Sequence, residues 1–83
     1  MNEEKHQKLM FVIQRFVDGK DRSIKAANQI EGLLEELFPE DDRFEEVVIA
    51  LASYRPGGGD YLYDEKQMTN ILIQTRKLIN SDN

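Results

Sequence analysis

The stretch YRPGGGDYLYD, residues 54–64, interrupts a chain whose remaining sequence has the apolar spacing of amphipathic helices. Proline disfavours helical geometry in the residue before it, so Pro56 predicts the end of one helix. Asp64 with Gln67 three residues later follows the capping-box pattern and predicts the start of another. Three consecutive glycines lose much conformational entropy on ordering, so we expect that the backbone here either uses dihedrals that other residues disfavour or approaches another group closely. Residues 61–63 can be extended, although the sequence offers no second strand for them to pair with.

Four helices are predicted on the two sides of this loop, spanning residues 3–18, 22–38, 43–54 and 65–79. Within each helix, apolar residues recur at the three- and four-residue spacing of one buried face. The expected buried residues are Leu9, Val12, Ile13, Phe16, Val17, Ile24, Ala27, Ile30, Leu34, Leu37, Phe38, Phe44, Val47, Val48, Leu51, Met68, Ile71, Leu72, Thr75, Leu78 and Ile79. The connections are short, which makes neighbouring helices antiparallel. The sequence therefore predicts an all-α fold, a compact bundle of four short, mainly antiparallel helices in a single domain, residues 1–83.

The helix ends carry their own signals. Gly19 stands where a left-handed residue commonly follows a helix, and Asp21 is expected to cap the second helix. Asp42 with Glu45 forms a capping-box-like pair at the start of the third. Gly32, inside the second helix, costs about 1 kcal/mol relative to alanine. The simplest explanation for a glycine at this position is a close approach between two helices.

The net charge of −5 is unevenly distributed along the chain. Residues 1–25 carry six basic and four acidic side chains, whereas residues 26–65 carry two basic and eleven acidic ones. A field of this sign disfavours nucleic acid and anionic membranes as partners. It favours a basic protein partner, or serves only solubility.

Composition and pattern also indicate location. The uninterrupted apolar run Leu9–Ile13 is far shorter than the roughly 20 residues that span a bilayer, and the chain opens with acidic residues where a signal peptide would carry basic ones. There is no cysteine, and hence no disulfide framework. These features favour a cytoplasmic location, although the absence of cysteine is compatible with other compartments.

The sequence offers no recognisable catalytic or metal-binding motif, and no cofactor is expected. His6 is the single histidine, which argues against a catalytic triad or a transition-metal centre. The acids at residues 40–42 lack the EF-hand spacing. The glycines at residues 57–59 are not followed by the lysine of a phosphate-binding loop. We therefore expect a protein that is not an enzyme. A small-molecule enzyme that uses paired carboxylates is kept as a third alternative.

What remains is a binding surface. Eight of the sixteen acidic residues lie between Glu31 and Glu46, at the end of one predicted helix and the start of the next. Tyrosines border the loop that contains Gly57, Gly58 and Gly59, which we call the glycine loop. Tyrosine is enriched at binding hot spots. The predicted partner-binding residues are Glu35, Asp41, Asp42, Glu45, Tyr54, Asp60, Tyr61 and Tyr63. The alternative is that the tyrosines cap the bundle end and the glycines only turn a corner.

The segment Pro56-Gly57-Gly58-Gly59-Asp60-Tyr61-Leu62-Tyr63 resembles a segment that precedes the last helix in colicin-type nuclease immunity proteins. That family consists of small acidic four-helix inhibitors of a basic toxin nuclease. The match lies at Pro56, Gly58, Asp60 and Tyr63, whereas the family's second tyrosine falls on Asp64. The resemblance implies that Asp60 and Tyr63 bind a partner, together with acids on an earlier helix.

Two hypotheses of function follow. The first is a small acidic, non-enzymatic protein-binding module, in its immunity-like version an inhibitor of a basic toxin or nuclease. The second is a structural or regulatory helical protein that self-associates, for example as a homodimer. Apolar residues off the predicted buried faces motivate the second hypothesis, namely Phe11, Leu33, Ile49 and Ile73.

Overall fold

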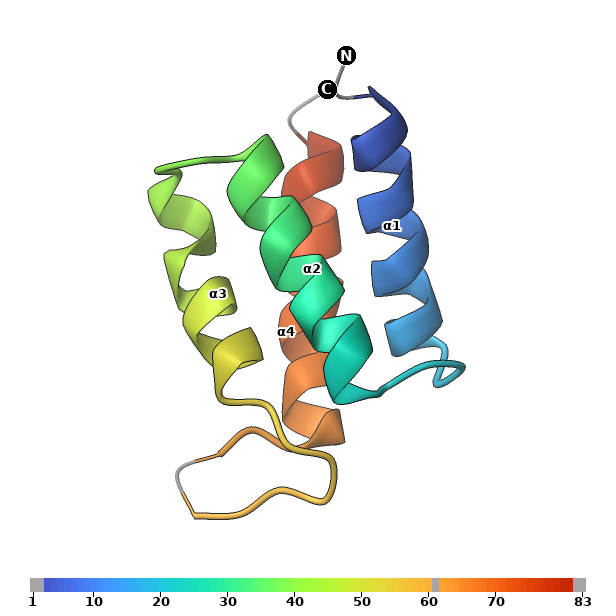
Figure 1. The fold of residues 1–83 in the computed structure, drawn as a ribbon, viewed down its shortest axis with the longest axis vertical. Coiled ribbons are helices and arrows are strands. Elements are labelled where there is room, and N and C mark those ends of the chain that lie inside the picture. The colour runs from blue at the N-terminus through green and yellow to red at the C-terminus, as the bar shows by residue number, and fades with distance from the viewer. Residues whose placement is uncertain (1–2, 61, 82–83) are drawn as a thin grey trace.

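The computed structural model describes residues 3–60 and 62–81, and four α-helices occupy most of them (Figure 1). The helices are α1 (Glu3–Val17), α2 (Ile24–Leu37), α3 (Glu45–Ala52) and α4 (Glu65–Ser81), with a 3-10 turn η1 (Asp42–Phe44) directly before α3. The predicted all-α bundle is confirmed. In the described part of the chain, no helix is long and apolar enough to cross a bilayer.

Successive helices run in opposite directions (Figure 1). The helix α2 lies between α1 and α3, and α4 packs behind it against both of these neighbours. The start of α1 and the end of α4 therefore lie at one end of the bundle. The α3–α4 connection, which contains the glycine loop, lies at the other end.

The core contains side chains from all four helices and from η1. Its fully enclosed apolar members include Leu9, Ile13, Phe16, Ile30, Leu34, Phe44, Met68, Leu72 and Ile79. Most predicted core positions are confirmed, but Ile24 and Leu78 are exposed. Ile24 is the first residue of α2, and the buried face of this helix begins with Ala26 and Ala27.

The ends of α1 and α2 follow the predicted pattern only in part. Gly19 has φ +82°, as expected after a helix. The assignment of Asp21 as the cap of α2 is wrong. Ser23 is the N-cap, and its Oγ accepts a hydrogen bond from the Ala26 N–H at 3.1 Å. Asp21 accepts from the Ser23 hydroxyl at 2.8 Å, and this bond lowers the pKa of Asp21. Asp21 thus supports the cap from two residues before it.

The capping box predicted from Asp42 and Glu45 is also wrong. Glu40 has φ +59°, and the chain then tightens into η1, so the first capped turn begins one residue earlier than expected. The cap is Asp41, whose carboxylate accepts a hydrogen bond from the Arg43 N–H at 3.0 Å. The helix α3 begins at Glu45 without a side-chain cap.

Gly32 does not mark a close approach between helices, which corrects another expectation. It is exposed, and a Cβ added at this position would meet no atom within 4 Å. Packing therefore does not require a glycine here.

Candidate functional site

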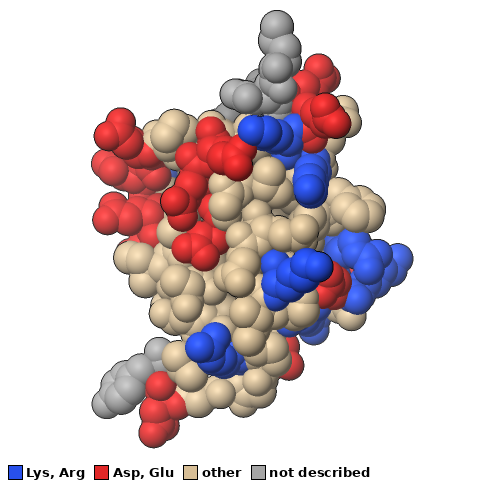
Figure 2. Space-filling model, in the orientation of Figure 1, with Lys and Arg blue, Asp and Glu red and all other residues tan. Residues whose placement is uncertain are grey.

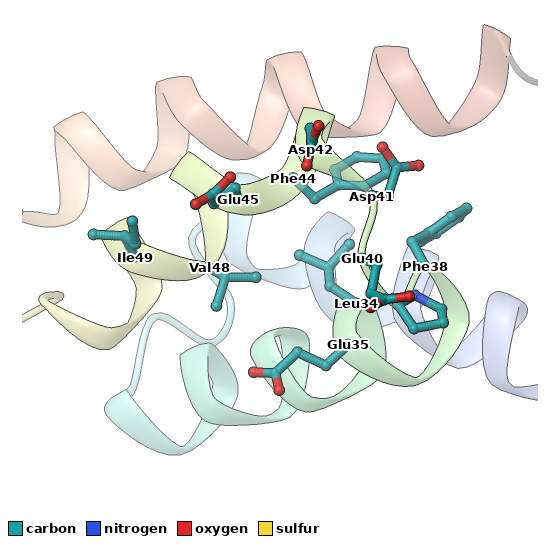
Figure 3. A pocket seen from close by; sticks show the side chains of 11 residues that line it. Leu34, Glu35, Phe38, Glu40, Asp41, Asp42, Phe44, Glu45, Val48 and Ile49 are labelled. Atoms are coloured by element: carbon teal, nitrogen blue, oxygen red, sulfur yellow. The ribbon is translucent and has the colours of Figure 1, made fainter.

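A groove lies between the last turns of α2 and the start of α3 (Figure 3). Its volume is about 430 Å³. The floor is apolar and consists of Leu34, Phe38, Phe44, Val48 and Ile49. The rim consists of the carboxylates Glu35, Glu40, Asp41, Asp42 and Glu45. We call this region the acidic groove.

The local sequence explains why the groove has an apolar floor. The apolar stripe of α2 continues to Phe38, and the stripe of α3 begins with Phe44, so the two helices meet through these rings at a centroid distance of 4.8 Å. The buried face of α3 consists of Val47, Ala50 and Leu51. Ile49 lies off this face and is 58% exposed. The groove thus offers apolar surface to a second molecule.

The carboxylates around the groove have few partners of their own. Among the residues that the structure describes, the side chains of Glu35, Asp42 and Glu45 form no hydrogen bond or ion pair. Asp41 is paired with Arg43 at 2.6 Å, and this bond lowers the pKa of Asp41. Figure 2 shows acidic side chains gathered over the α2–α3 end and basic side chains on the α1 side. The field at the groove is therefore negative.

Four of the predicted binding residues line this one groove, namely Glu35, Asp41, Asp42 and Glu45. Sequence reasoning missed the apolar floor because Phe38, Phe44 and Val48 were all assigned to the core. Ile49 carried the available signal, since it is apolar yet lies off the predicted buried face of its helix.

The glycine loop at the other end of α3 has the unusual backbone that its sequence predicts. Gly57 and Gly58 have φ of +88° and +77°. Hydrogen bonds hold the loop, from the Gly58 N–H to the Arg55 carbonyl at 2.9 Å and from the Gly57 N–H to the Glu65 carboxylate at 2.8 Å. The second bond lowers the pKa of Glu65. Beside the loop lies a hollow of about 630 Å³, lined mostly by polar groups.

Tyr54 is a core residue, which corrects its assignment to the binding set. It is 1% exposed, and its ring meets Phe16 edge-on at 5.3 Å. Its hydroxyl donates a hydrogen bond to the Arg22 carbonyl at 2.5 Å. Burial raises the pKa of the Tyr54 phenol. A side chain enclosed in this way is not available to a partner.

The remaining loop residues divide between structure and surface. Tyr63 is half-buried and forms one parallel bridge with Tyr54. The Tyr63 N–H donates to the Ser53 carbonyl at 3.2 Å, and the Tyr63 carbonyl accepts from the Arg55 N–H at 2.9 Å. The expectation that residues 61–63 have nothing to pair with is therefore wrong at Tyr63. Asp60 is exposed. Tyr61 lies outside the described residues.

The acids and the tyrosines of the glycine loop do not form one surface, although the sequence places both in one predicted binding set. The helix α3 separates them, with the acidic groove at its start and the glycine loop beyond its end (Figure 1). Its eight residues rise about 12 Å at 1.5 Å per residue. The candidate site is therefore the acidic groove, with Asp60 and Tyr63 as a separate region.

Comparisons of the chain with family models, with curated proteins and with solved structures found no match. Within residues 3–60 and 62–81, no three histidine or acidic side chains are grouped so that they could hold a metal ion. The functional interpretation consequently rests on the chemistry of the acidic groove.

Proposed function

We propose that this chain is a small acidic, non-enzymatic protein-binding module whose acidic groove takes a basic segment of a protein partner. The observation that carries the proposal is that four carboxylates selected from the sequence lie around one apolar floor. Carboxylates alone would be an ordinary solvated surface. Carboxylates around an open apolar floor match a ligand that is both apolar and cationic.

Arginine fits this description best among the side chains. Its aliphatic stem packs on apolar surface while its charged head stays at the rim. Its planar guanidinium binds carboxylates in two-point contacts and stacks on aromatic faces. Arg43 of this chain already lies over the Phe44 ring, 5.2 Å from its centre. A partner arginine would make a similar contact with Phe38, which is half-buried, and would pair with the free carboxylates.

The resemblance to nuclease immunity proteins gives this proposal a specific version, in which the partner is a basic toxin or nuclease that the chain inhibits. Asp60 and Tyr63 would then contribute from the glycine loop. A partner that contacts both regions must lie along α3. The charge of the groove would accelerate association with a basic toxin, and apolar contact would slow dissociation.

A photo-crosslinking experiment tests the proposal. Ile49 on the groove floor is replaced by p-benzoylphenylalanine, and Gly32, exposed on α2 outside the groove, is replaced in a control. Both proteins are irradiated in extract of the native host. Proteins captured from Ile49 but not from Gly32 are identified, purified and measured by calorimetry.

The expected captured protein is basic, and Glu35→Lys with Glu45→Lys weakens its binding at least tenfold. Asp18→Lys, an exposed reversal at the far end of α1, leaves binding unchanged. An acidic captured protein, or equal effects of the groove and control reversals, would overturn the proposal. Nuclease activity that the wild-type chain blocks supports the immunity-like version, and a basic partner without such activity removes that version alone.

A further inference from the structure

The side chain of Phe11 on α1 is largely exposed to solvent and is not among the buried residues of this helix. Phe11 is 62% exposed, more than any other large apolar side chain among the described residues. The Arg15 guanidinium lies over the ring, 5.7 Å from its centre. Lys8 precedes Phe11 by one helical turn and shares this face, since residues three and four apart on a helix are neighbours. The outer face of α1 thus presents a ring between two cations.

This face of α1 and the acidic groove are complementary. One offers an exposed ring flanked by positive charge, and the other an open apolar floor ringed by negative charge. Figure 2 shows the two signs of charge over different sides of the same molecule. We propose that the chain associates with a second copy of itself, with Phe11 of one copy packed on Val48 and Ile49 of the next. Lys8 and Arg15 then meet the free carboxylates of Glu35 and Glu45.

A single chain cannot make this contact internally. The helix α2 lies between α1 and α3 (Figure 1), and no residue of α1 lines the acidic groove. The contact joins two different surfaces and is therefore head-to-tail, which leaves one groove and one α1 face open after each step. One helix face in one groove is also small beside the roughly 1,200–2,000 Å² of a stable interface. We expect weak association that grows with concentration and continues beyond the dimer.

This inference rests on the proposed function, because it uses the acidic groove as the binding surface. A second copy of the chain is one molecule that the groove would bind. A basic partner and a second copy would then compete for the same floor. At high concentration, self-association would cover Ile49 when no partner is present and would release it when a tighter ligand arrives.

Sedimentation velocity over a concentration series tests the contact. The wild type should exceed its monomer mass of 9.7 kDa as concentration rises, and the excess should shrink at about 0.5 M salt because the charge pairs are screened. Phe11→Ala, which removes an exposed ring, and the Glu35→Lys/Glu45→Lys variant should each remain monomeric. Circular dichroism and thermal melts confirm that both variants are folded.

A mixture of the two variants tests directly whether the α1 face of one copy binds the acidic groove of another. The groove of Phe11→Ala is intact, and the α1 face of the charge-reversed variant is intact, so an equimolar mixture should form a one-to-one complex that stops at the dimer. A monomeric wild type, a self-associating Phe11→Ala, or a mixture that stays monomeric overturns the inference. If the wild type is monomeric but Ile49 still captures a basic protein, this inference fails and the proposed function stands. If the mixture associates and the crosslinker at position 49 captures only other copies of this chain, this inference stands and the proposed function fails.

Discussion

The two ends of α3 contain similar residues, acids beside aromatic rings, but these residues have different roles. At the glycine loop, most of the described polar groups form bonds within the chain, whereas Asp60 is exposed. Asp64 and Gln67 cap α4 reciprocally at 2.8 and 3.0 Å, which confirms the predicted capping box, and Glu65 accepts from Gly57. At the acidic groove, Glu35, Asp42 and Glu45 have no such partners among the described residues.

This difference distinguishes residues that stabilise the chain from residues that are available to bind a partner. The loop looked functional in the sequence because glycine, proline and tyrosine are unusual there, yet its hydrogen bonds explain most of them as turn, bridge and cap. Of the rim acids, Asp41 caps η1, but no bond within the described residues accounts for the gathering of Glu35, Asp42 and Glu45 around an apolar floor. Features that stability does not explain are the better candidates for function. The acidic groove is therefore the stronger candidate site.

The largest expected effect is at Tyr54. Tyr54→Ala should lower the free energy of unfolding by about 3–5 kcal/mol, as for other large aromatic truncations in a core. Tyr54→Phe should lower it by about 1–2 kcal/mol, because only the bond to the Arg22 carbonyl is lost. Urea denaturation measures both variants. A loss below about 1 kcal/mol for Tyr54→Ala would contradict a structural role for the loop end.

The second effect separates backbone strain from crowding in the loop. Gly57→Ala should lower the free energy of unfolding by about 1–2 kcal/mol, since its positive φ disfavours a side chain but the surrounding space is open. Gly58→Ala should lose more, because the added Cβ would lie 3.2 Å from the Asp64 Cβ. Thermal melts of the two variants give the difference. Equal losses would mean that Asp64 shifts freely and that the α4 cap is not rigidly placed.

The fold could be predicted from the sequence because helix periodicity and loop breakers depend on local residues. The four stripes, Gly19 and the α4 cap all follow from spacing within a few positions. The starts of α2 and α3 could not be assigned because each has several capping candidates in sequence, Asp21 or Ser23 and Asp41 or Asp42. The positive φ at Glu40, which tightens the turn into η1, has no sequence signal.

The candidate site was predictable only in its charges. The acids cluster in sequence, so their proximity in space was expected. The groove itself depends on how α2 and α3 pack around the Phe38–Phe44 contact, which is a tertiary property. Tyr54 was misassigned for a similar reason, because its burial depends on Phe16 and Arg22, distant residues that the fold brings to it.

The third prediction concerns the middle of α2 and should raise stability. Gly32→Ala should increase the free energy of unfolding by about 0.5–1 kcal/mol, because alanine restricts the unfolded chain and fits an open helical position. Gly19→Ala is the matched control and should be destabilising, since Gly19 has φ +82°. Denaturant midpoints of both variants decide the matter. Destabilisation by Gly32→Ala would indicate a close contact at this position after all.

The fourth prediction uses pH to examine the loop end. The bond from the Gly57 N–H holds the pKa of Glu65 below its ordinary value of 4.5. A depressed pKa contributes stability above the unfolded value, and this contribution is lost as pH falls through the folded value. Wild-type stability should therefore fall below about pH 4.5, and Glu65→Gln should fall less over the same range. Parallel pH profiles from urea titrations would show that the bond to Gly57 does not stabilise the loop.

The smallest expected effect on stability is at the acidic groove. Glu35→Lys should change the free energy of unfolding by no more than about 0.5 kcal/mol, because its side chain is exposed and forms no internal bond. Any change should be a gain, since a lysine near the C-terminus of α2 complements the helix dipole and relieves repulsion among the rim acids. A loss above about 1 kcal/mol would mean that Glu35 stabilises the fold, and the contrast between the two ends of α3 would disappear. A variant that unfolds like the wild type but no longer binds a basic partner would place the function of this carboxylate outside its own chain.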